Sequence, residues 1–429
     1  MPALDLCHPL RIASLVVATF LAPLPMAAQL LGAEFRVNSY TTGDQAYPAI
    51  SSDASGNFVV VWKSVAQDGS GSGIFAQRFE NSGLALGGEF QVNSYTTLDQ
   101  YAPAVASDAA GNFLVVWLRG PDGGGHRGLF AQRFDASGSA AGTEFQVNVV
   151  TTGQPARPAA TADGLGNVIV VWQDEEVIAR RFGTDGTPES GELRVNTETS
   201  DSQGEAAVAA DAAGNFVVVW DSYGQDGSSY GIFGRRFDVS GSAMGSEFQV
   251  NTYTTSWQGT PAVAMTDAGE FVAVWNRDHP GLQGSDIVGQ RFDAAGSPLG
   301  GEFQASGLSL GFKGRPAVAL AAAGSFVVTW DAPGRDGSGA GVLAQEFDST
   351  GAKAGGEFRV NSYTPASQAM PVLAAGADGT FVAAWQSDSS QDGMGSGVFA
   401  QRLATLPFLD GFESGATCAW TAAVGGGCP

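Results

Sequence analysis

The sequence predicts an all-β fold, a seven-bladed β-propeller built from four-stranded antiparallel blades. Three observations predict it. The chain contains seven copies of one repeat, each repeat holds four strand-like segments, and the incomplete repeats at the two ends add up to one complete unit. A linear β-solenoid is the alternative fold for a repeat of this length.

The repeat is marked by a tryptophan that ends an apolar run. These tryptophans are 55 residues apart, except for a spacing of 48 between Trp172 and Trp220. A proline precedes each of them by 14 residues, except in the fourth repeat, where Ala206 takes its place. Since the same large apolar residue recurs at one register, we expect it to pack between sheets. The seven are Trp62, Trp117, Trp172, Trp220, Trp275, Trp330 and Trp385.

Each repeat contains four short segments with strand character. In the second repeat they read PAVAS, NFLVVW, GLFAQRF and EFQVN, and Asp, Gly and Ser fill the connections that close hairpins. The second and third segments are apolar at consecutive positions, which indicates strands covered on both faces. Small sheets stacked face to face around an axis provide that cover for every repeat.

The two ends of the repeat region predict a closed ring. The region begins with EFRVN, residues 34–38, which is a fourth strand with nothing before it, and ends with GVFAQRL, residues 397–403, which is a third strand with nothing after it. Pairing these segments completes the seventh blade and removes two exposed edges. We therefore assign residues 32–403 to the propeller.

The segments outside the repeats indicate export. Residues 1–28 have a basic residue, a short apolar run and small residues near Ala28, which is the layout of a cleaved signal peptide. The tail, residues 404–429, holds the two cysteines left after cleavage, Cys418 and Cys428, which we expect to form a disulfide in an oxidising compartment. The predicted location is extracellular or at the cell surface, with the periplasm as the alternative.

The charge of the chain limits its partners. A formal net charge of −22, with 43 acidic and 21 basic residues, would repel nucleic acid and anionic membranes. No apolar run is long enough to span a bilayer, which needs about 20 residues. We expect a monomer with a glycan or protein ligand, and neither nucleic acid nor a membrane span.

The repeat also resembles a known one. The strings D-x-x-G-N-F-V-V-V-W, Q-D-G-S-G-x-G-I-F-A-Q-R-F and G-x-E-F-Q-V-N resemble a repeat of secreted bacterial and cyanobacterial proteins, which generally have no assigned activity. The resemblance covers residues 32–403. It implies binding outside the cell, and it offers no catalytic residues to transfer.

Residues that recur in most blades are assigned to architecture. We expect the arginines that end the third strands to pair with nearby carboxylates, and the asparagines that end the fourth strands to bond turn backbone. The arginines are Arg78, Arg133, Arg181, Arg236, Arg291 and Arg402, and the asparagines are Asn38, Asn93, Asn148, Asn196, Asn251 and Asn361.

The predicted function is therefore non-enzymatic binding, and no catalytic residue is assigned. The alternative is a glycan-processing enzyme, sialidase-like or another glycoside-active propeller. Since alternate connections of a meander share a face, the long loops between second and third strands lie beside the linkers between blades, and this long-loop face is where we expect a ligand. Its non-repeated aromatic residues suit sugar or peptide stacking. These candidate contacts are Trp257, Tyr101, Tyr223, Tyr230 and His126.

The Q-D-G loops raise the question of calcium. Each offers one dependable carboxylate, whereas calcium takes about six to eight oxygens, so we interpret the Asp-Gly pair as a turn. Weak calcium binding by pooled carboxylates, such as Asp99 with Asp122, stays open as the alternative, and no other cofactor is expected. The loop aspartates are Asp68, Asp122, Asp226, Asp336 and Asp392.

Overall fold

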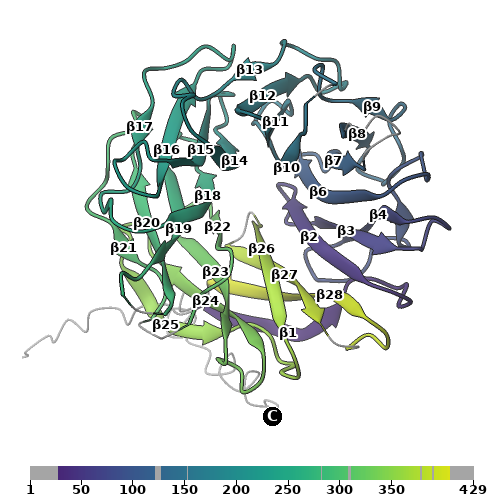
Figure 1. The fold of residues 1–429 in the computed structure, drawn as a ribbon. Coiled ribbons are helices and arrows are strands. Elements are labelled where there is room, and N and C mark those ends of the chain that lie inside the picture. Colours follow the sequence, from purple (N-terminus) through teal and green to yellow (C-terminus); the bar gives the residue numbers. More distant parts are fainter. Residues whose placement is uncertain are drawn as a thin grey trace, which may run out of the picture.

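The computed structural model describes residues 28–120, 127–151, 153–281, 283–307, 311–376, 379–388 and 391–405. Within these residues, 28 strands form seven four-stranded antiparallel sheets. Figure 1 shows the sheets as blades arranged in a ring around a central opening. The predicted seven-bladed propeller is confirmed. No helix in the described part of the chain is long and apolar enough to cross a membrane. Most of the predicted signal peptide, and both cysteines of the predicted disulfide, lie outside the described residues.

Each blade runs outward from the axis, and we number the blades 1 to 7 by their innermost strands. The innermost strands are β2 (Gln45–Ser52), β6 (Gln100–Ser107), β10 (Ala156–Ala162), β14 (Gln203–Ala210), β18 (Gln258–Met265), β22 (Ala317–Leu320) and β26 (Gln368–Ala375). The second strands are β3 (Phe58–Val65), β7 (Phe113–Arg119), β11 (Val168–Gln173), β15 (Phe216–Tyr223), β19 (Phe271–Asp278), β23 (Phe326–Pro333) and β27 (Thr380–Asp388).

The outer half of each blade is less regular. The third strands are β4 (Ser72–Phe79), β8 (Gly128–Phe134), β12 (Val177–Phe182), β16 (Tyr230–Phe237), β20 (Ser285–Phe292), β24 (Ala340–Phe347) and β28 (Ser396–Thr405). The outermost strands are β5 (Phe90–Gln91), β9 (Phe145–Gln146), β13 (Leu193–Arg194), β17 (Phe248–Gln249), β21 (Phe303–Gln304), β25 (Lys353–Arg359) and β1 (Ala28–Arg36). Five of the outermost strands keep only two paired residues.

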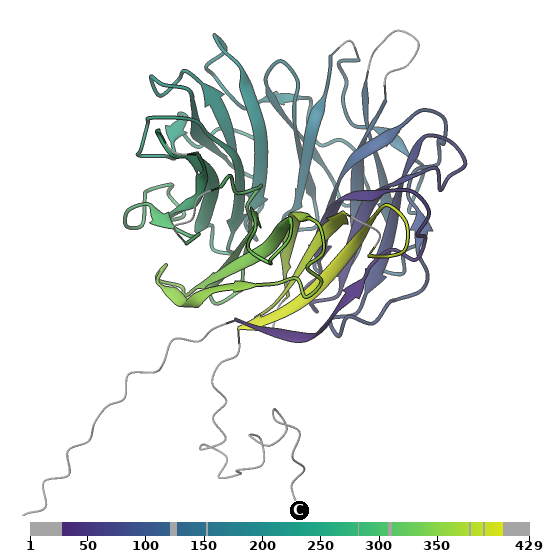
Figure 2. The ribbon, with the colours of Figure 1, turned by 60° about the horizontal axis from the view of Figure 1, so that its bottom comes forward.

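The seventh blade joins the two ends of the repeat region. Strand β1 pairs antiparallel with β28, from Ala28 opposite Thr405 to Arg36 opposite Phe399, with a bulge between Leu31 and Phe35. Figure 2 shows β1, in purple, beside β28, in yellow. The strand is longer than the predicted EFRVN segment, because pairing continues past the bulge to Ala28.

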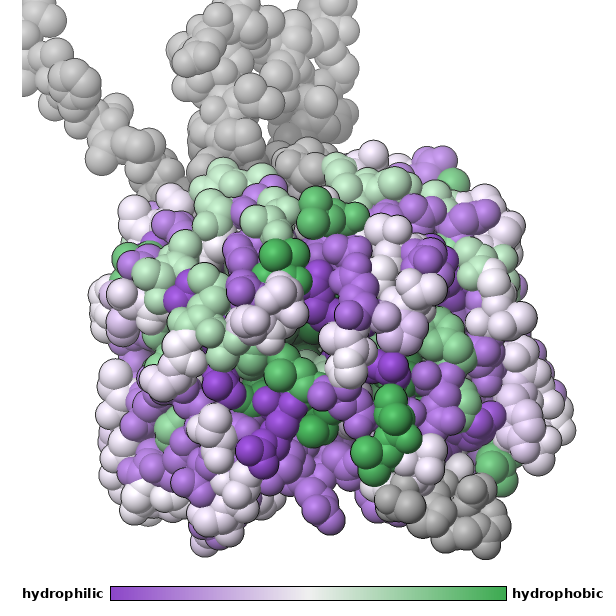
Figure 3. Space-filling model, turned by 90° about the horizontal axis from the view of Figure 1, so that it is seen from above, coloured by the Kyte–Doolittle hydropathy of each residue, from purple (hydrophilic) through white to green (hydrophobic). Residues whose placement is uncertain are grey.

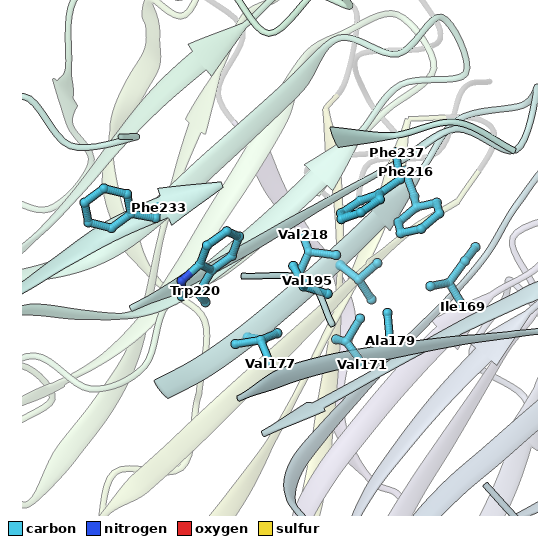
Figure 4. Packing of buried hydrophobic residues seen from close by; sticks show 12 residues of the cluster. Ile169, Val171, Val177, Ala179, Val195, Phe216, Val218, Trp220, Phe233 and Phe237 are labelled. Carbon is cyan, nitrogen blue, oxygen red and sulfur yellow. The ribbon is translucent and has the colours of Figure 1, made fainter. Parts of the chain in front are cut away.

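The core lies between adjacent blades. Figure 4 shows the cluster between blades 3 and 4, where Ile169 and Val171 of β11 pack toward Trp220 and Phe216 of β15. Trp220 is fully buried, and its Nε1 donates a hydrogen bond to Gln203 Oε1 at 3.0 Å. All seven repeated tryptophans are at most 1% exposed, which confirms their assignment to the core.

The blade arginines differ from the prediction. Arg236 of blade 4 donates to the backbone carbonyls of Ala294 and Ala295, in the turn between β20 and β21 of blade 5. Arg78, Arg133, Arg291 and Arg402 reach the corresponding turn of the next blade in the same way. Pairing with carboxylates was therefore the wrong expectation for these five arginines. Their guanidinium groups reach the turn of the next blade and contact its backbone carbonyl oxygens instead. Arg181 does pair with Asp163 and Glu189, at 3.5 and 3.3 Å.

The asparagines at the ends of the outermost strands behave as predicted, with one addition. Asn251 donates to the carbonyl of Tyr253 at 2.9 Å, and its Oδ1 also accepts the N–H of Ile232 in β16 at 2.8 Å. The other five asparagines make the same pair of contacts. Each asparagine therefore adds one side-chain hydrogen bond between the third strand and the chain that follows the outermost strand.

Candidate functional site

The innermost strands pair irregularly with the second strands at one position near the long-loop face. In six blades the pairing of the first and second strands shifts register there, which is a β-bulge. The residue before the repeated proline takes a positive φ in five blades, a conformation that costs about 1–3 kcal/mol for a residue other than glycine. The bulge recurs in six blades, so it belongs to the architecture, and in all seven blades the residue at this position lines the wall of the central opening.

The residues at this position form what we call the axial ring. Unlike the tryptophans or the blade arginines, they differ from blade to blade, so the fold does not dictate their chemistry. They line a central cavity of about 510 Å³ together with the repeated prolines and alanines that follow them. In blade order the ring consists of Tyr47, Ala102, Arg157, Glu205, Thr260, Arg315 and Met370.

Three ring residues meet across the cavity. Arg157 of blade 3 and Arg315 of blade 6 both contact the same Oε1 atom of Glu205 in blade 4, and the contact from Arg315 measures 2.9 Å. The guanidinium groups are about half exposed, at 49% and 54% of their side chains, whereas the Glu205 side chain is 15% exposed. Two cations therefore share one carboxylate at the wall of the cavity.

A second layer of polar side chains supports the ring from behind. Asp221, which directly follows Trp220, accepts the N–H of Thr260 at 3.4 Å, and Asp331 accepts the N–H of Met370 at 3.2 Å. Both carboxyl groups are held between blades, where the following blade begins its innermost strand. Burial, together with the nearby charge of Glu205, raises the pKa of Asp221 to about 7. Burial raises the pKa of Asp331 to about 6.

Glycines make room for these buried carboxyl groups. A Cβ at Gly204 would lie 1.6 Å from Asp221 Oδ1, and one at Gly314 would lie 2.1 Å from Asp331 Oδ1. Neither position has a positive φ, so close approach to the aspartate, not backbone conformation, explains the glycine. In both blades a glycine on or just before the first strand thus accompanies an aspartate on the second strand.

A side pocket of about 450 Å³ adjoins the central cavity at blades 1 and 2 and shares Tyr47 and Ala102 with it. Lys63, Asp99 and Arg127 also line this pocket. One predicted contact lies here. Tyr101 lines the side pocket, and burial raises the pKa of its hydroxyl.

The remaining predicted contacts lie elsewhere. Tyr223 and Tyr230 face each other across β15 and β16, with ring centroids 5.2 Å apart. Trp257 is half-buried against the innermost strand of blade 5, where a Cβ at Gly259 would lie 2.4 Å from its ring. His126 lies outside the described residues. Among the candidates that the structure describes, it therefore brings the two blade-4 tyrosines together and joins Tyr101 to the central cavity by way of the side pocket.

The loop aspartates contact their own blades. Asp226 and Asp336 each accept a backbone N–H two residues later, at 3.0 and 3.2 Å, which is the bonding of an Asx turn. They also accept the side chains of Asn251 and Asn361, both at 3.2 Å. Asp68 makes the same turn contact, at 3.1 Å, and Asp392 accepts Asn38 Nδ2 at 2.9 Å. Asp122 lies outside the described residues, and the Asp99 carboxylate lies beside Gly71 of the preceding blade.

Two further findings delimit the site. Among the residues that the structure describes, no three His, Cys, Asp or Glu side chains are grouped so that they could hold a metal ion. A smaller cavity of about 250 Å³ lies between the tight turns of blades 1 and 2, where Asp53 and Arg78 line it. Both residues have counterparts in other blades. The lining of this cavity is therefore part of the repeat, whereas the residues of the axial ring differ between blades.

Comparison with known proteins supports the fold alone. No protein-family model matches the chain, and no curated protein matches it in sequence. A protein of unknown function from Dyadobacter fermentans is similar in structure, with a TM-score of 0.53 and 9% identity, over 88% of this chain and 99% of that one. A fungal alcohol oxidase in complex with copper gives a TM-score of 0.51 and 14% identity, over 87% of this chain and 76% of that one. An α-L-arabinofuranosidase of Fusarium graminearum gives a TM-score of 0.48 and 11% identity, over 86% and 98%.

Sequence reasoning missed the axial ring. The sequence does hold a signal, since the residue before the repeated proline varies in charge and size from repeat to repeat. The search for candidate contacts was confined to non-repeated aromatic residues of the long loops. The bulges at Arg157 and Glu205 cannot be recognised from the pattern of apolar residues in their strands.

Proposed function

We propose that the protein is a secreted, non-enzymatic binding propeller whose ligand, a glycan, enters the central cavity from the long-loop face. One observation carries the proposal: the seven side chains of the axial ring, which belong to six residue types, line one central cavity, whereas the buried tryptophans of the blades are the same in every repeat. The predicted signal peptide supports export, and the resemblance to secreted repeat proteins supports a role in binding.

The size of the cavity favours a small polar ligand over a protein. Its volume of about 510 Å³ falls within the range of about 300–1,000 Å³ that is usual for sites that take small molecules. A protein partner would require about 800 Å² of matching surface on each side. Figure 3 shows one side of the molecule, where polar residues cover most of the surface and apolar residues appear singly or in small groups.

The lining suits a saccharide. Tyr47 is 47% exposed and presents an aromatic ring at the border of the central cavity and the side pocket, where a sugar ring could stack. Arg157, Glu205, Thr260 and Arg315, from blades 3 to 6, supply donors and acceptors for hydroxyl groups. Small-ligand pockets are usually lined mainly by apolar and aromatic side chains with a few convergent polar groups, and the prolines and alanines of this cavity, with its few polar side chains, fit that make-up.

A glycan array probed with the full mature chain, followed by calorimetry, tests this function. We expect saturable binding to a glycan and no release of product. Tyr47→Ala should weaken that binding by about tenfold, the loss of one stacked ring. Tyr95→Ala is the matched control, because Tyr95 is similarly exposed, at 42%, and does not line the central cavity or the side pocket. Absence of glycan binding, or equal loss in both variants, would contradict the proposal.

The alternative is glycan processing, and one observation favours it. Asp221 has a pKa raised to about 7 and is electrostatically coupled to Glu205, which lines the cavity. A protonated carboxyl group near an ionised one is the pairing that glycoside hydrolysis uses. Against it, Asp221 is only 5% exposed and lies behind the ring. A panel of glycoside substrates decides between the two, since turnover that disappears in both Glu205→Gln and Asp221→Asn would establish the enzyme.

A further inference from the structure

We propose that the glycan carries a carboxylate, and that Arg157 and Arg315 hold this group at the wall of the central cavity. The inference rests on the proposed function, because it names the chemical class of the glycan that the same cavity takes. It starts from the excess of positive charge in the Arg157–Glu205–Arg315 group, in which two guanidinium groups contact one carboxylate oxygen.

The geometry leaves the arginines able to bind a second carboxylate. Each guanidinium has five N–H donors in a planar fork, and Glu205 takes up one contact from each. Both side chains are about half exposed, and both line the cavity. A carboxylate that bridges them would form charge-assisted, potentially bidentate hydrogen bonds, which are about twice as strong as neutral ones.

The charge of the surrounding walls supports the same ligand. The chain has a formal net charge of −22, yet the central cavity and the side pocket together are lined by four cationic side chains and two carboxylates. The cations are Arg157 and Arg315 in the central cavity and Lys63 and Arg127 in the side pocket. A local excess of positive charge inside an acidic protein attracts anions to this opening and away from the outer surface.

The aromatic ring of Tyr47, which lies close to Lys63, favours a sugar acid. Tyr47 lies between the two cavities, and Lys63 is 5.9 Å from the centre of its ring. An acidic saccharide presents both an apolar ring face for the tyrosine and a carboxylate for the arginines, so one glycan offers a partner for both features of the lining.

The test compares uronic acid trisaccharides with their carboxyl-reduced, neutral counterparts, by calorimetry on the full mature chain. We expect the acidic member of at least one pair to bind about tenfold more tightly or better. Arg315→Gln should abolish that preference while leaving the Arg157–Glu205 contact in place. Arg335→Gln is the matched control, because Arg335 is in the same blade, pairs with Glu357, and does not line either cavity.

The outcomes separate the inference from the proposed function. If acidic and neutral trisaccharides bind equally well, the inference is wrong and glycan binding stands. If Arg315→Gln and Arg335→Gln reduce the acidic preference equally, the cavity arginines are not the cause and the inference is wrong. If no saccharide binds but a peptide with a free C-terminal carboxylate does, glycan binding itself is refuted, and the inference falls with it.

Discussion

The Glu34 carboxylate accepts hydrogen bonds from the backbone N–H and the hydroxyl of Ser362, at 2.6 and 2.9 Å, across a sequence separation of 328 residues. The equivalent glutamates of the other blades also accept a backbone N–H of the preceding linker, and Glu89 accepts both the N–H and the hydroxyl of Ser39. The contact at Glu34 is the one that joins blade 7 to blade 6 through the N-terminal strand. It therefore belongs to the closure of the ring.

Removing the closing strand should destabilise the whole propeller. A mature chain that starts at residue 37 lacks β1, so β28 becomes an open edge and Glu34 no longer bonds Ser362. We expect a loss on the order of 3–5 kcal/mol in the free energy of unfolding, measured with urea. Leu30→Ala, at an exposed position of the same strand, is the control and should change it by less than about 0.5 kcal/mol. An unchanged unfolding midpoint in the truncated chain would show that closure does not stabilise the fold.

The buried Asp221 carboxyl should make stability depend on pH. In the folded protein this group keeps its proton up to a pH of about 7, whereas its ordinary pKa is 3.8. The folded state therefore binds more protons than the unfolded state between these values, and stability falls as the pH rises from about 4 to about 7.

Asp221→Asn removes this titration and keeps the shape of the side chain. We expect the variant to be more stable than the wild type at pH 8, by on the order of 2–4 kcal/mol, with the advantage shrinking as the pH falls to 5. Urea unfolding of both proteins at several pH values measures it. A difference that stays constant over this range would mean that Asp221 is ionised in the folded protein, contrary to the burial argument.

The Q-D-G loops should behave as turns. Asp226 bonds the Ser228 N–H and the Asn251 side chain, so Asp226→Ala should cost about 1–2 kcal/mol of unfolding free energy through lost hydrogen bonds. In the turn interpretation, millimolar calcium produces neither heat in calorimetry nor a shift in the melting temperature of the wild type. A calcium-dependent shift that Asp226→Ala reduces would instead support the pooled-carboxylate alternative.

Much of the fold followed from repetition. Seven tryptophans at a nearly constant spacing and an incomplete repeat at each end were sufficient for the blade number and the closure, because both follow from chain order. Contacts between blades were less predictable. Whether Arg236 meets a carboxylate or a carbonyl depends on how adjacent sheets are rotated, and the repeat does not encode that rotation in any single position.

The candidate site was predictable only in part. The long-loop face and Tyr101 were identified, since unusual residues in loops are visible in the sequence. The axial ring was not, because Arg157 and Arg315 are 158 positions apart and meet at Glu205 only through the closure of the blades into a ring. A comparison of the repeats column by column would have found the position, although not the contact.

The most direct test of the central claim is to fill the cavity. Ala102 is the smallest residue of the axial ring, so Ala102→Trp introduces bulk there without removing a polar contact of Arg157, Glu205 or Arg315. Ala140→Trp, at an exposed turn of the same blade, is the matched control. Calorimetric titration with the glycan found on the array should show binding lost by about tenfold or more in Ala102→Trp and retained in Ala140→Trp, with both proteins folded. Wild-type affinity in the folded Ala102→Trp protein would contradict binding in the central cavity.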